Sequence, residues 1–247
     1  MTKLFTFLAV IALIGALNVN LASASVQFSV TSLDHDGTPD TDTTDEAVEL
    51  FNATSGTGNV TVTKGTYTVG TYRENDLFNT INFSGGNFGG DESLPSGIGG
   101  DHFIMQATVK LHLDPGAYQI GFGSDDGGFL ELDGAVFSTK RGDQSAAPGD
   151  TLYYNSPRGH RLSDGDLTVG TPTTFDLTAL FWERGGGESW EIFIRDASGG
   201  FLNVGTTFDG SEIADGGWVI LSDGALGGKA QFVIPEPSTY AVFAGLI

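Results

Sequence analysis

Two adjacent acidic residues, Asp125 and Asp126, are the part of the sequence whose residue types point most directly to chemistry. They follow Ser124 and precede Gly127. Neighbouring carboxylates repel each other unless a cation or hydrogen-bond donors compensate their charge. Two roles therefore stay open from the residues alone. The pair binds a hard cation such as calcium, whose ligands are oxygen atoms, or it forms a tight turn in which the carboxylates accept backbone N–H groups.

A second acidic stretch runs from Asp34 to Asp42 and is similar to calcium loops of the Asp-x-Asp-Gly type. It lacks the glutamate that ends a twelve-residue calcium loop, and Pro39 interrupts it. We therefore expect a solvated loop that leads into the N-cap of a helix.

Residues typical of catalysis do not form a recognisable pattern. The chain contains 4 histidines without metal-ligand spacing, and no Gly-x-Ser-x-Gly motif occurs. Carboxylate pairs arise by chance in a chain with 31 acidic residues, so they identify no acid–base pair. We expect a protein that is not an enzyme.

Composition narrows the class of protein further. The net charge of −20 repels nucleic acid and anionic membranes and excludes both as partners. Cysteine is absent, which excludes disulfides and thiol chemistry. The 37 glycines and 18 phenylalanines fit short strands joined by glycine turns better than helices.

The elements that would position the acidic pair are mostly strands. One short helix is expected from Thr43 to Phe51, with Thr at its N-cap and Val48 and Phe51 facing inward. Alternating apolar residues predict strands at 25–31, 59–63, 66–72 and 102–113. After a turn at 114–116, Tyr118, Ile120 and Phe122 continue inward, and a strand pair at 173–183 and 189–195 is joined across 185–187. The sequence thus predicts an all-β fold, an antiparallel β-barrel or sandwich with one short N-terminal helix.

Residues 116–134 (GAYQIGFGSDDGGFLELDG) resemble the core signature of the protective-antigen-type fourteen-kilodalton domain, a β-barrel of antiparallel strands. Residues 177–192 (LTALFWERGGGESWEI) are similar to the next landmark of that family, and the resemblance covers roughly residues 60–232. In its sugar-binding members an Asp-Asp pair joined by a cis peptide grips a calcium ion, which holds two sugar hydroxyls. The resemblance assigns that role to Asp125 and Asp126.

The rest of the implied binding site departs from the family pattern. The facing loop, 184–189, has no asparagine, so Glu183 or Glu188 would have to substitute for a side-chain amide. Trp190 follows the glycine turn and is expected beside the ion, where its ring would stack on a sugar. Other aromatic residues with the same capacity are Tyr153, Tyr154, Trp182 and Trp218, of which Trp182 is expected in the core. The predicted ligand-binding residues are Asp125, Asp126, Trp190 and Glu188, with calcium on the two aspartates.

Both ends of the chain have the character of sorting signals. Residues 1–24 combine a basic start, an apolar run and a small-x-small pattern, which predicts a cleaved signal peptide. Residues 233–247 begin VIPEPSTYA and resemble the PEP-CTERM signal of exosortase substrates in Gram-negative bacteria. The eight residues after Thr239 are too few for a membrane span, and no basic tail follows, so we expect a truncated signal. One β domain, 25–232, lies between the two signals.

Together these features predict an exported protein of the cell surface or extracellular matrix. Its leading function is carbohydrate binding assisted by calcium, with a polysaccharide or glycan and the exosortase processing machinery as partners. The alternative is a structural surface protein that uses the same domain as a scaffold without a ligand.

Overall fold

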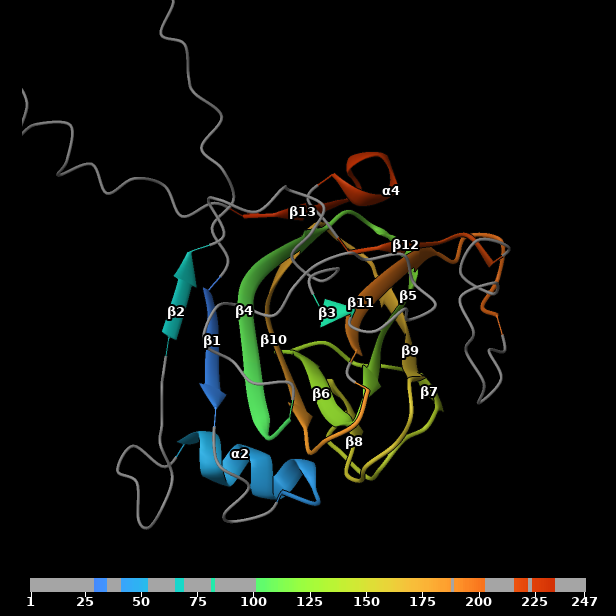
Figure 1. Ribbon diagram of the computed structural model, residues 1–247. Helices are drawn as coiled ribbons and strands as arrows, with labels where there is room; N and C mark the ends of the chain where they lie inside the picture. Colours follow the sequence, from blue (N-terminus) through green and yellow to red (C-terminus); the bar gives the residue numbers. More distant parts are fainter. Residues whose placement is uncertain are drawn as a thin grey trace, which may run out of the picture.

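The computed structural model describes residues 29–34, 41–52, 65–68, 81–82, 101–187, 189–202, 216–221 and 224–233. Over these ranges the chain forms two antiparallel β-sheets and two short helices (Figure 1). The predicted signal peptide, most of the acidic stretch after Asp34, the strand at 59–63 and the sorting motif from Ile234 onward lie outside the described residues.

The first sheet has the strand order β2-β1-β4-β10-β6-β8, and β13 pairs with β4 beside this path. Its strands are β1 (Ser29–Asp34), β2 (Gly65–Thr68), β4 (Phe103–Leu113), β6 (Gly127–Leu132), β8 (Thr151–Tyr154), β10 (Thr173–Glu183) and β13 (Ala230–Phe232). The long strands β4 and β10 pair over their whole length, from Phe103 opposite Glu183 to Leu113 opposite Thr173.

The second sheet has the order β12-β11-β5-β9-β7, and β3 pairs with β11 beside this path. Its strands are β3 (Ile81–Asn82), β5 (Gly116–Asp125), β7 (Thr139–Gly142), β9 (Arg161–Val169), β11 (Ser189–Asp196) and β12 (Trp218–Ile220). The three central strands are held together by long antiparallel registers between β5 and both of its neighbours.

The all-β prediction is confirmed, but the described residues form a two-sheet sandwich and not a closed barrel. The predicted strand pair at 173–183 and 189–195 has nearly correct boundaries and wrong pairing. β10 pairs with β4 and β6, whereas β11 pairs with β5, β12 and β3. Alternation along a strand reports which side chains are buried but not which neighbour the strand pairs with, so a glycine turn between two strands does not by itself indicate a hairpin. The turn between β10 and β11 is a crossing from one sheet to the other.

The core lies between the sheets. In β4 the predicted inward face is confirmed, because Met105, Ala107, Leu111 and Leu113 are buried while Thr108 and Lys110 are exposed. In β5 the side chains of Tyr118, Ile120 and Phe122 are almost completely buried, as predicted. At about 25 cal/mol per Å² of apolar surface removed from water, this layer supplies most of the stabilisation of the sandwich.

The predicted helix is present as α2 (Thr44–Asn52), and it covers the outer face of the first sheet. Ala47 and Phe51 pack against Ile104, Leu180 and Trp182, which form a small second core. The helix begins as expected, with the Glu46 N–H donating to Thr43 Oγ1 at 3.2 Å.

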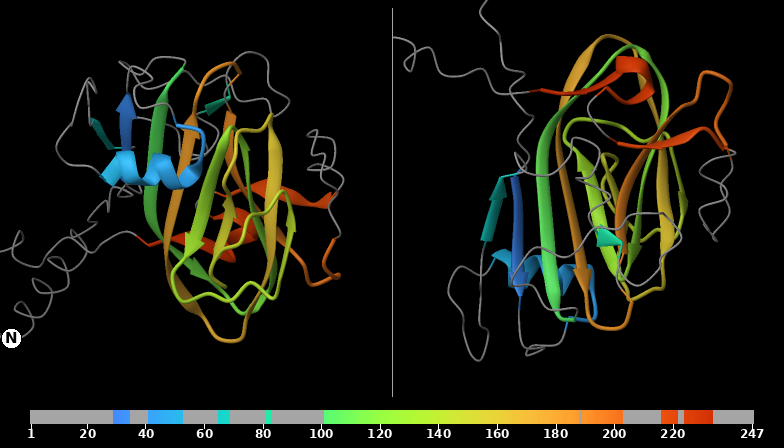
Figure 2. Two further views of the ribbon diagram at one scale, coloured as in Figure 1. Left: turned by 90° about the horizontal axis from the view of Figure 1, so that it is seen from below. Right: turned by 45° about the horizontal axis from the view of Figure 1, so that its top comes forward.

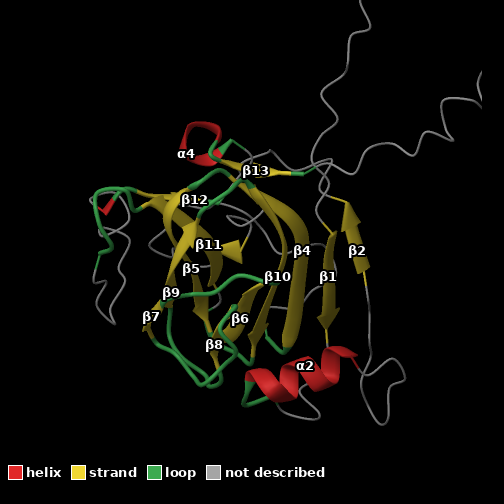
Figure 3. Ribbon diagram, turned by 180° about the vertical axis from the view of Figure 1, so that it is seen from behind, coloured by secondary structure: helices red, strands yellow, loops and turns green. Residues whose placement is uncertain are grey.

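The short helix α4 (Ala225–Gly228) and β13 lie at the opposite end of the molecule from α2 (Figures 2 and 3). Among the described helices, neither is long and apolar enough to cross a lipid bilayer.

Candidate functional site

The acidic pair forms a corner where the chain crosses from the second sheet to the first. β5 ends at Asp125 in the second sheet and β6 begins at Gly127 in the first. The peptide bond between Asp125 and Asp126 is cis, as the resemblance implied. Another crossing, from β10 to β11, lies beside this corner, because Ser189 is opposite Asp125 and Trp182 is opposite Gly127.

Asp126 fastens this corner to two neighbouring loops. Its side chain is 6% exposed. The backbone N–H of Arg158 donates to Oδ1 at 3.1 Å, and that of Arg184 donates to Oδ2 at 3.0 Å. Burial raises the pKa of Asp126, while these two hydrogen bonds act against the rise because they favour the charged form. The predicted turn role, in which a carboxylate accepts backbone N–H groups, is therefore realised by Asp126.

A buried arginine supports the same corner from inside the sandwich. The Arg158 guanidinium donates to Ser124 Oγ at 2.8 Å and to Ser163 Oγ at 3.0 Å. It also lies over the rings of Tyr154 and Phe122, 4.5 Å and 5.3 Å from their centroids. Burial lowers the pKa of Arg158 to about 10, which leaves it charged at neutral pH. Cation–π contacts of this kind compensate part of the lost hydration.

The helix α2 holds the corner from outside. Thr44 Oγ1 donates to the Tyr154 carbonyl at 2.6 Å and accepts from Trp182 Nε1 at 2.8 Å. Gly127 fits under this contact only because it has no side chain, since a Cβ there would lie 2.8 Å from Trp182 Nε1 and 3.0 Å from Thr44 Oγ1. The Ser-Asp-Asp-Gly motif thus ends in glycine for a steric reason.

The crossing from β10 to β11 is also stabilised by carboxylates. Glu183 is fully buried, and its Oε1 accepts the Gly185 N–H at 2.7 Å. Asp101 Oδ1 accepts the Gly186 N–H at 3.1 Å, and Arg184 forms an ion pair with Asp42 at 2.5 Å. Glu183, which the sequence suggested as a substitute ligand, therefore serves the backbone of its own loop.

The predicted aromatic contact is wrong. Trp190 is 1% exposed, and its ring stacks on Phe181 in the core with centroids 5.8 Å apart. Side chains alternate between the two faces of a strand, so Trp190 points inward because Ser189 before it points outward. The sequence alone does not show which of the two faces the core. Trp182 is buried as expected. Glu188 lies outside the described residues, so its predicted ligand role stays a prediction.

The donor set at the acidic corner fits calcium in type. Carboxylate oxygens are the ligands that this hard cation prefers. Each oxygen of Asp126 accepts one N–H and keeps a further acceptor position, since a carboxylate offers about four in total. Asp125, the preceding residue, is half-buried and carries a second carboxylate.

Another group of acids was missed by sequence analysis. Glu131, Asp133 and Asp150 place one carboxylate oxygen each within 4.8 Å of one another, at the end of β6 and just before β8. Burial, followed by the charges of Asp150 and Asp133, raises the pKa of Glu131. The β6–β8 pairing creates this group, and nothing in the spacing of 131, 133 and 150 along the chain announces it.

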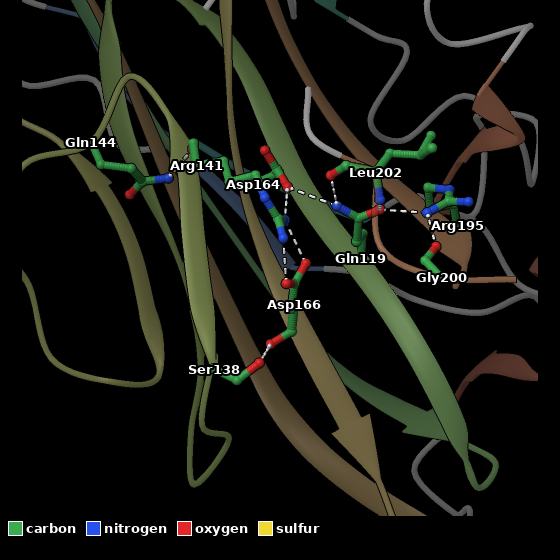
Figure 4. Close-up of polar contacts among 9 residues, drawn as sticks. All are labelled: Gln119, Ser138, Arg141, Gln144, Asp164, Asp166, Arg195, Gly200 and Leu202. Carbon is green, nitrogen blue, oxygen red and sulfur yellow. Dashed lines mark hydrogen bonds and ion pairs between the residues drawn. The ribbon is translucent and has the colours of Figure 1, made fainter. Parts of the chain in front are cut away.

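A polar network on the second sheet was missed as well (Figure 4). Arg141 of β7 contacts both oxygens of Asp166 at 2.5 Å and Oδ2 of Asp164 at 3.3 Å. Asp164 is fully buried, and burial raises its pKa to about 6, although the positive charge of Arg141 acts to lower it. The alternation of acids in β9 is typical of a solvated face, so only the fold shows that this face is covered.

The same network continues through Gln119 to the segment that follows β11. The Gln119 side-chain amide donates to the Leu202 carbonyl and accepts the Leu202 N–H, both at 2.9 Å. Arg195 donates to Gln119 Oε1 and, at 3.1 Å, to the Gly200 carbonyl. These contacts hold residues 200–202 against the sheet (Figure 4).

Comparisons with known proteins return structures but no sequence relatives. No family model matches the chain, and no curated protein matches it. The PA14 sugar-binding domain from an RTX adhesin aligns over 73% of this chain and 96% of its own length, with 16% identity and a TM-score of 0.46. The PA14 domain of the MpAFP antifreeze protein aligns over 41% of this chain with 14% identity and a TM-score of 0.31. The second alignment spans about half of that domain, 47%. Both neighbours are PA14 domains.

Proposed function

We propose that this protein is an exported binding protein of the cell surface or matrix, and not an enzyme, and that it binds a glycan at the acidic corner with calcium on Asp125 and Asp126. The observation that carries the proposal is the position of the pair. Two acidic residues follow each other where the β5–β6 and β10–β11 crossings lie side by side, and Asp126 is fixed there by N–H groups from both neighbouring loops.

Calcium suits this corner for an electrostatic reason. Asp42 and Asp101 also lie on the surrounding loops, through their contacts with Arg184 and Gly186. The charge of Asp42 contributes to the raised pKa of Asp126. When bound, calcium supplies positive charge among these acids and open coordination positions for vicinal hydroxyls. Asp126 and Asp125 would hold it, and the loops that surround them would shape the sugar site.

A scaffold without a ligand is the second candidate. It is favoured by the hydrogen bonds of Asp126, which by themselves explain why a buried carboxylate is tolerated at the corner. In that case the corner ties two sheets together and has no further role.

Export and sorting belong to the same proposal. The residue pattern of 1–24 supports removal of a signal peptide, and the VIPEPSTYA motif supports processing by exosortase in a Gram-negative envelope. Fractionation of cells that express the tagged full chain tests this part. We expect the protein outside the cytoplasm, with loss of export when residues 4–17 are deleted.

Calorimetry of the full chain separates binding from scaffold. We expect calcium to release or absorb heat with about one equivalent bound, and Asp125→Asn to weaken that binding at least tenfold. Asp125→Asn is chosen because it leaves the two N–H contacts of Asp126 in place. Asp176→Asn is the matched control, since Asp176 is exposed and pairs with Lys110 away from the corner.

The remaining outcomes are equally informative. Polysaccharides added with calcium should bind, and should be released by a chelator. Calcium binding that survives Asp125→Asn but disappears in Asp133→Asn would assign the ion to the Glu131 group instead. An absence of heat with calcium and with glycans would leave the scaffold as the function.

A further inference from the structure

Three arginines gather around the acidic corner of a chain that is strongly acidic overall. The sequence has six arginines and a net charge of −20. Arg184 follows β10 and Arg158 precedes β9, and the backbone N–H groups of both donate to Asp126. Arg161 is the first residue of β9 and lies opposite Ser124 in the register of β5 and β9. Half of the arginines of the chain thus stand at the proposed glycan site.

The fold accounts for only one of these three side chains. Arg158 is buried, where it binds two serine hydroxyls and lies over two aromatic rings. The side chains of Arg161 and Arg184 are 48% and 44% exposed, and each is in an ion pair, Arg161 with Asp143 at 3.5 Å and Arg184 with Asp42 at 2.5 Å. Exposed ion pairs contribute only about 0–1 kcal/mol to stability. Stability therefore does not explain why two exposed guanidinium groups stand at this corner.

Positive charge reaches the acidic pair from both sides. Burial raises the pKa of Asp126, and the charge of Arg184 is among the groups that act to lower it. Burial lowers the pKa of Arg158 to about 10, and the charge of Asp125 is among those that act in the opposite direction. The acidic pair thus has Arg184 on the side of β10 and β11, and Arg158 with Arg161 on the side of β9.

This combination of charges fits an acidic sugar better than a neutral one. A guanidinium is a planar fork of N–H donors that binds a carboxylate through two parallel hydrogen bonds. Calcium takes oxygen ligands of every kind, hydroxyl and carboxylate oxygens included. A neutral sugar offers hydroxyls to the calcium ion but no anionic group to the arginines. A uronic acid carries vicinal hydroxyls and a carboxylate on one ring, so it serves both.

We propose that the glycan bound at the acidic corner contains uronic acids, whose carboxylates are bound by Arg161 and Arg184. This inference rests on the proposed function, a calcium-assisted glycan site. Each guanidinium has five N–H donors, so an ion pair with Asp143 or Asp42 leaves donors for a ligand. Elsewhere the net negative charge of the chain repels an acidic polymer, so the contact is confined to a few sugar rings at the corner.

The test compares two ligands that differ only in charge. The full chain, with calcium in excess, is titrated by calorimetry with trigalacturonate, a chain of three galacturonic acids, and with its methyl ester. The ester keeps every ring hydroxyl and loses the negative charges. We expect the acid form to bind at least about tenfold more tightly than the ester, since hydrogen bonds between charged groups are the stronger ones. A titration without protein corrects for calcium that the sugar itself binds.

Substitution of the two exposed arginines tests their role. Arg161→Gln and Arg184→Gln should each weaken binding of trigalacturonate about fivefold or more and leave binding of the ester within about twofold. Arg184→Gln keeps the backbone N–H that Asp126 accepts, so the corner is retained. Lys110→Gln is the matched control, because it removes the same charge from an exposed residue that pairs with Asp176 away from the corner. It should change neither affinity.

The outcomes separate this inference from the proposed function. Equal affinities for trigalacturonate and its ester would overturn the inference and leave a calcium-assisted glycan site in place. A preference for the acid that Arg161→Gln and Arg184→Gln both retain, with urea midpoints that show both variants folded, would also overturn it. Absence of binding for every glycan, with calcium present, would overturn the proposed function and this inference with it.

Discussion

Removal of the Asp126 carboxylate should loosen three segments at once. Its two oxygens accept the backbone N–H groups of Arg158 and Arg184 at 3.1 and 3.0 Å. A hydrogen bond to a charged group contributes about 1.5–3 kcal/mol, and a buried N–H left without a partner costs about 1–3 kcal/mol. Part of this loss of stability is offset, because the variant no longer has a carboxylate whose burial requires desolvation. We expect Asp126→Ala to lower the free energy of unfolding by about 3 kcal/mol.

Two further variants sharpen this expectation. Asp126→Asn keeps one acceptor oxygen, so it should lose about half as much as Asp126→Ala. Asp125→Asn leaves both N–H contacts intact and should change stability by less than about 1 kcal/mol.

Urea unfolding of the full chain, in chelator and at one pH, measures all three free energies. If Asp126→Ala unfolds at the same urea concentration as the wild type, the hydrogen bonds of Asp126 do not hold the corner and the reasoning fails.

Three other substitutions test contacts elsewhere in the sandwich by the same unfolding assay. Thr44→Val removes the acceptor of Trp182 Nε1 and should lower the free energy of unfolding by about 1–3 kcal/mol. An unchanged urea midpoint would contradict the role of this contact in holding α2 against the corner. Gly128→Ala would place a Cβ 2.2 Å from the Leu180 carbonyl, so we expect a folded yield far below that of the wild type. Glu191 is fully buried in β11, which raises its pKa to about 9, and Glu191→Gln, in chelator, tests that shift. Wild-type stability should fall by up to about 1.4 kcal/mol per pH unit between about pH 4.5 and 9, because the folded state binds the proton more tightly, whereas the variant should lack this slope.

The fold class and the main strands were predictable because burial leaves a period of two in the sequence. β4 alternates from Ala107 to Leu113 as its residues indicate, and in β5 the predicted inward residues Tyr118, Ile120 and Phe122 are buried, although their neighbours in β5 are buried as well. Sheet membership was not predictable in the same way. A glycine-rich turn between two apolar strands fits a hairpin and a crossing between sheets equally well, and the structure has a crossing between β5 and β6 and another between β10 and β11.

The candidate site was predictable only where a local motif carries it. Asp125 and Asp126 were found because they adjoin in sequence, and the structure places them at a corner. Arg158, Arg161 and Arg184 gather around that corner through strand pairing and the hydrogen bonds of Asp126, so no spacing rule reports their closeness. Trp190 was misassigned for a related reason, since a shift of one position in a strand exchanges the core and outer faces.

The most direct test of calcium at the acidic corner is an anomalous difference map from crystals of the full chain grown with excess calcium. The account predicts a peak within about 2.3–2.6 Å of carboxylate oxygens of both Asp125 and Asp126. A well-ordered corner without a peak there, under calcium concentrations that saturate the protein in solution, would contradict it.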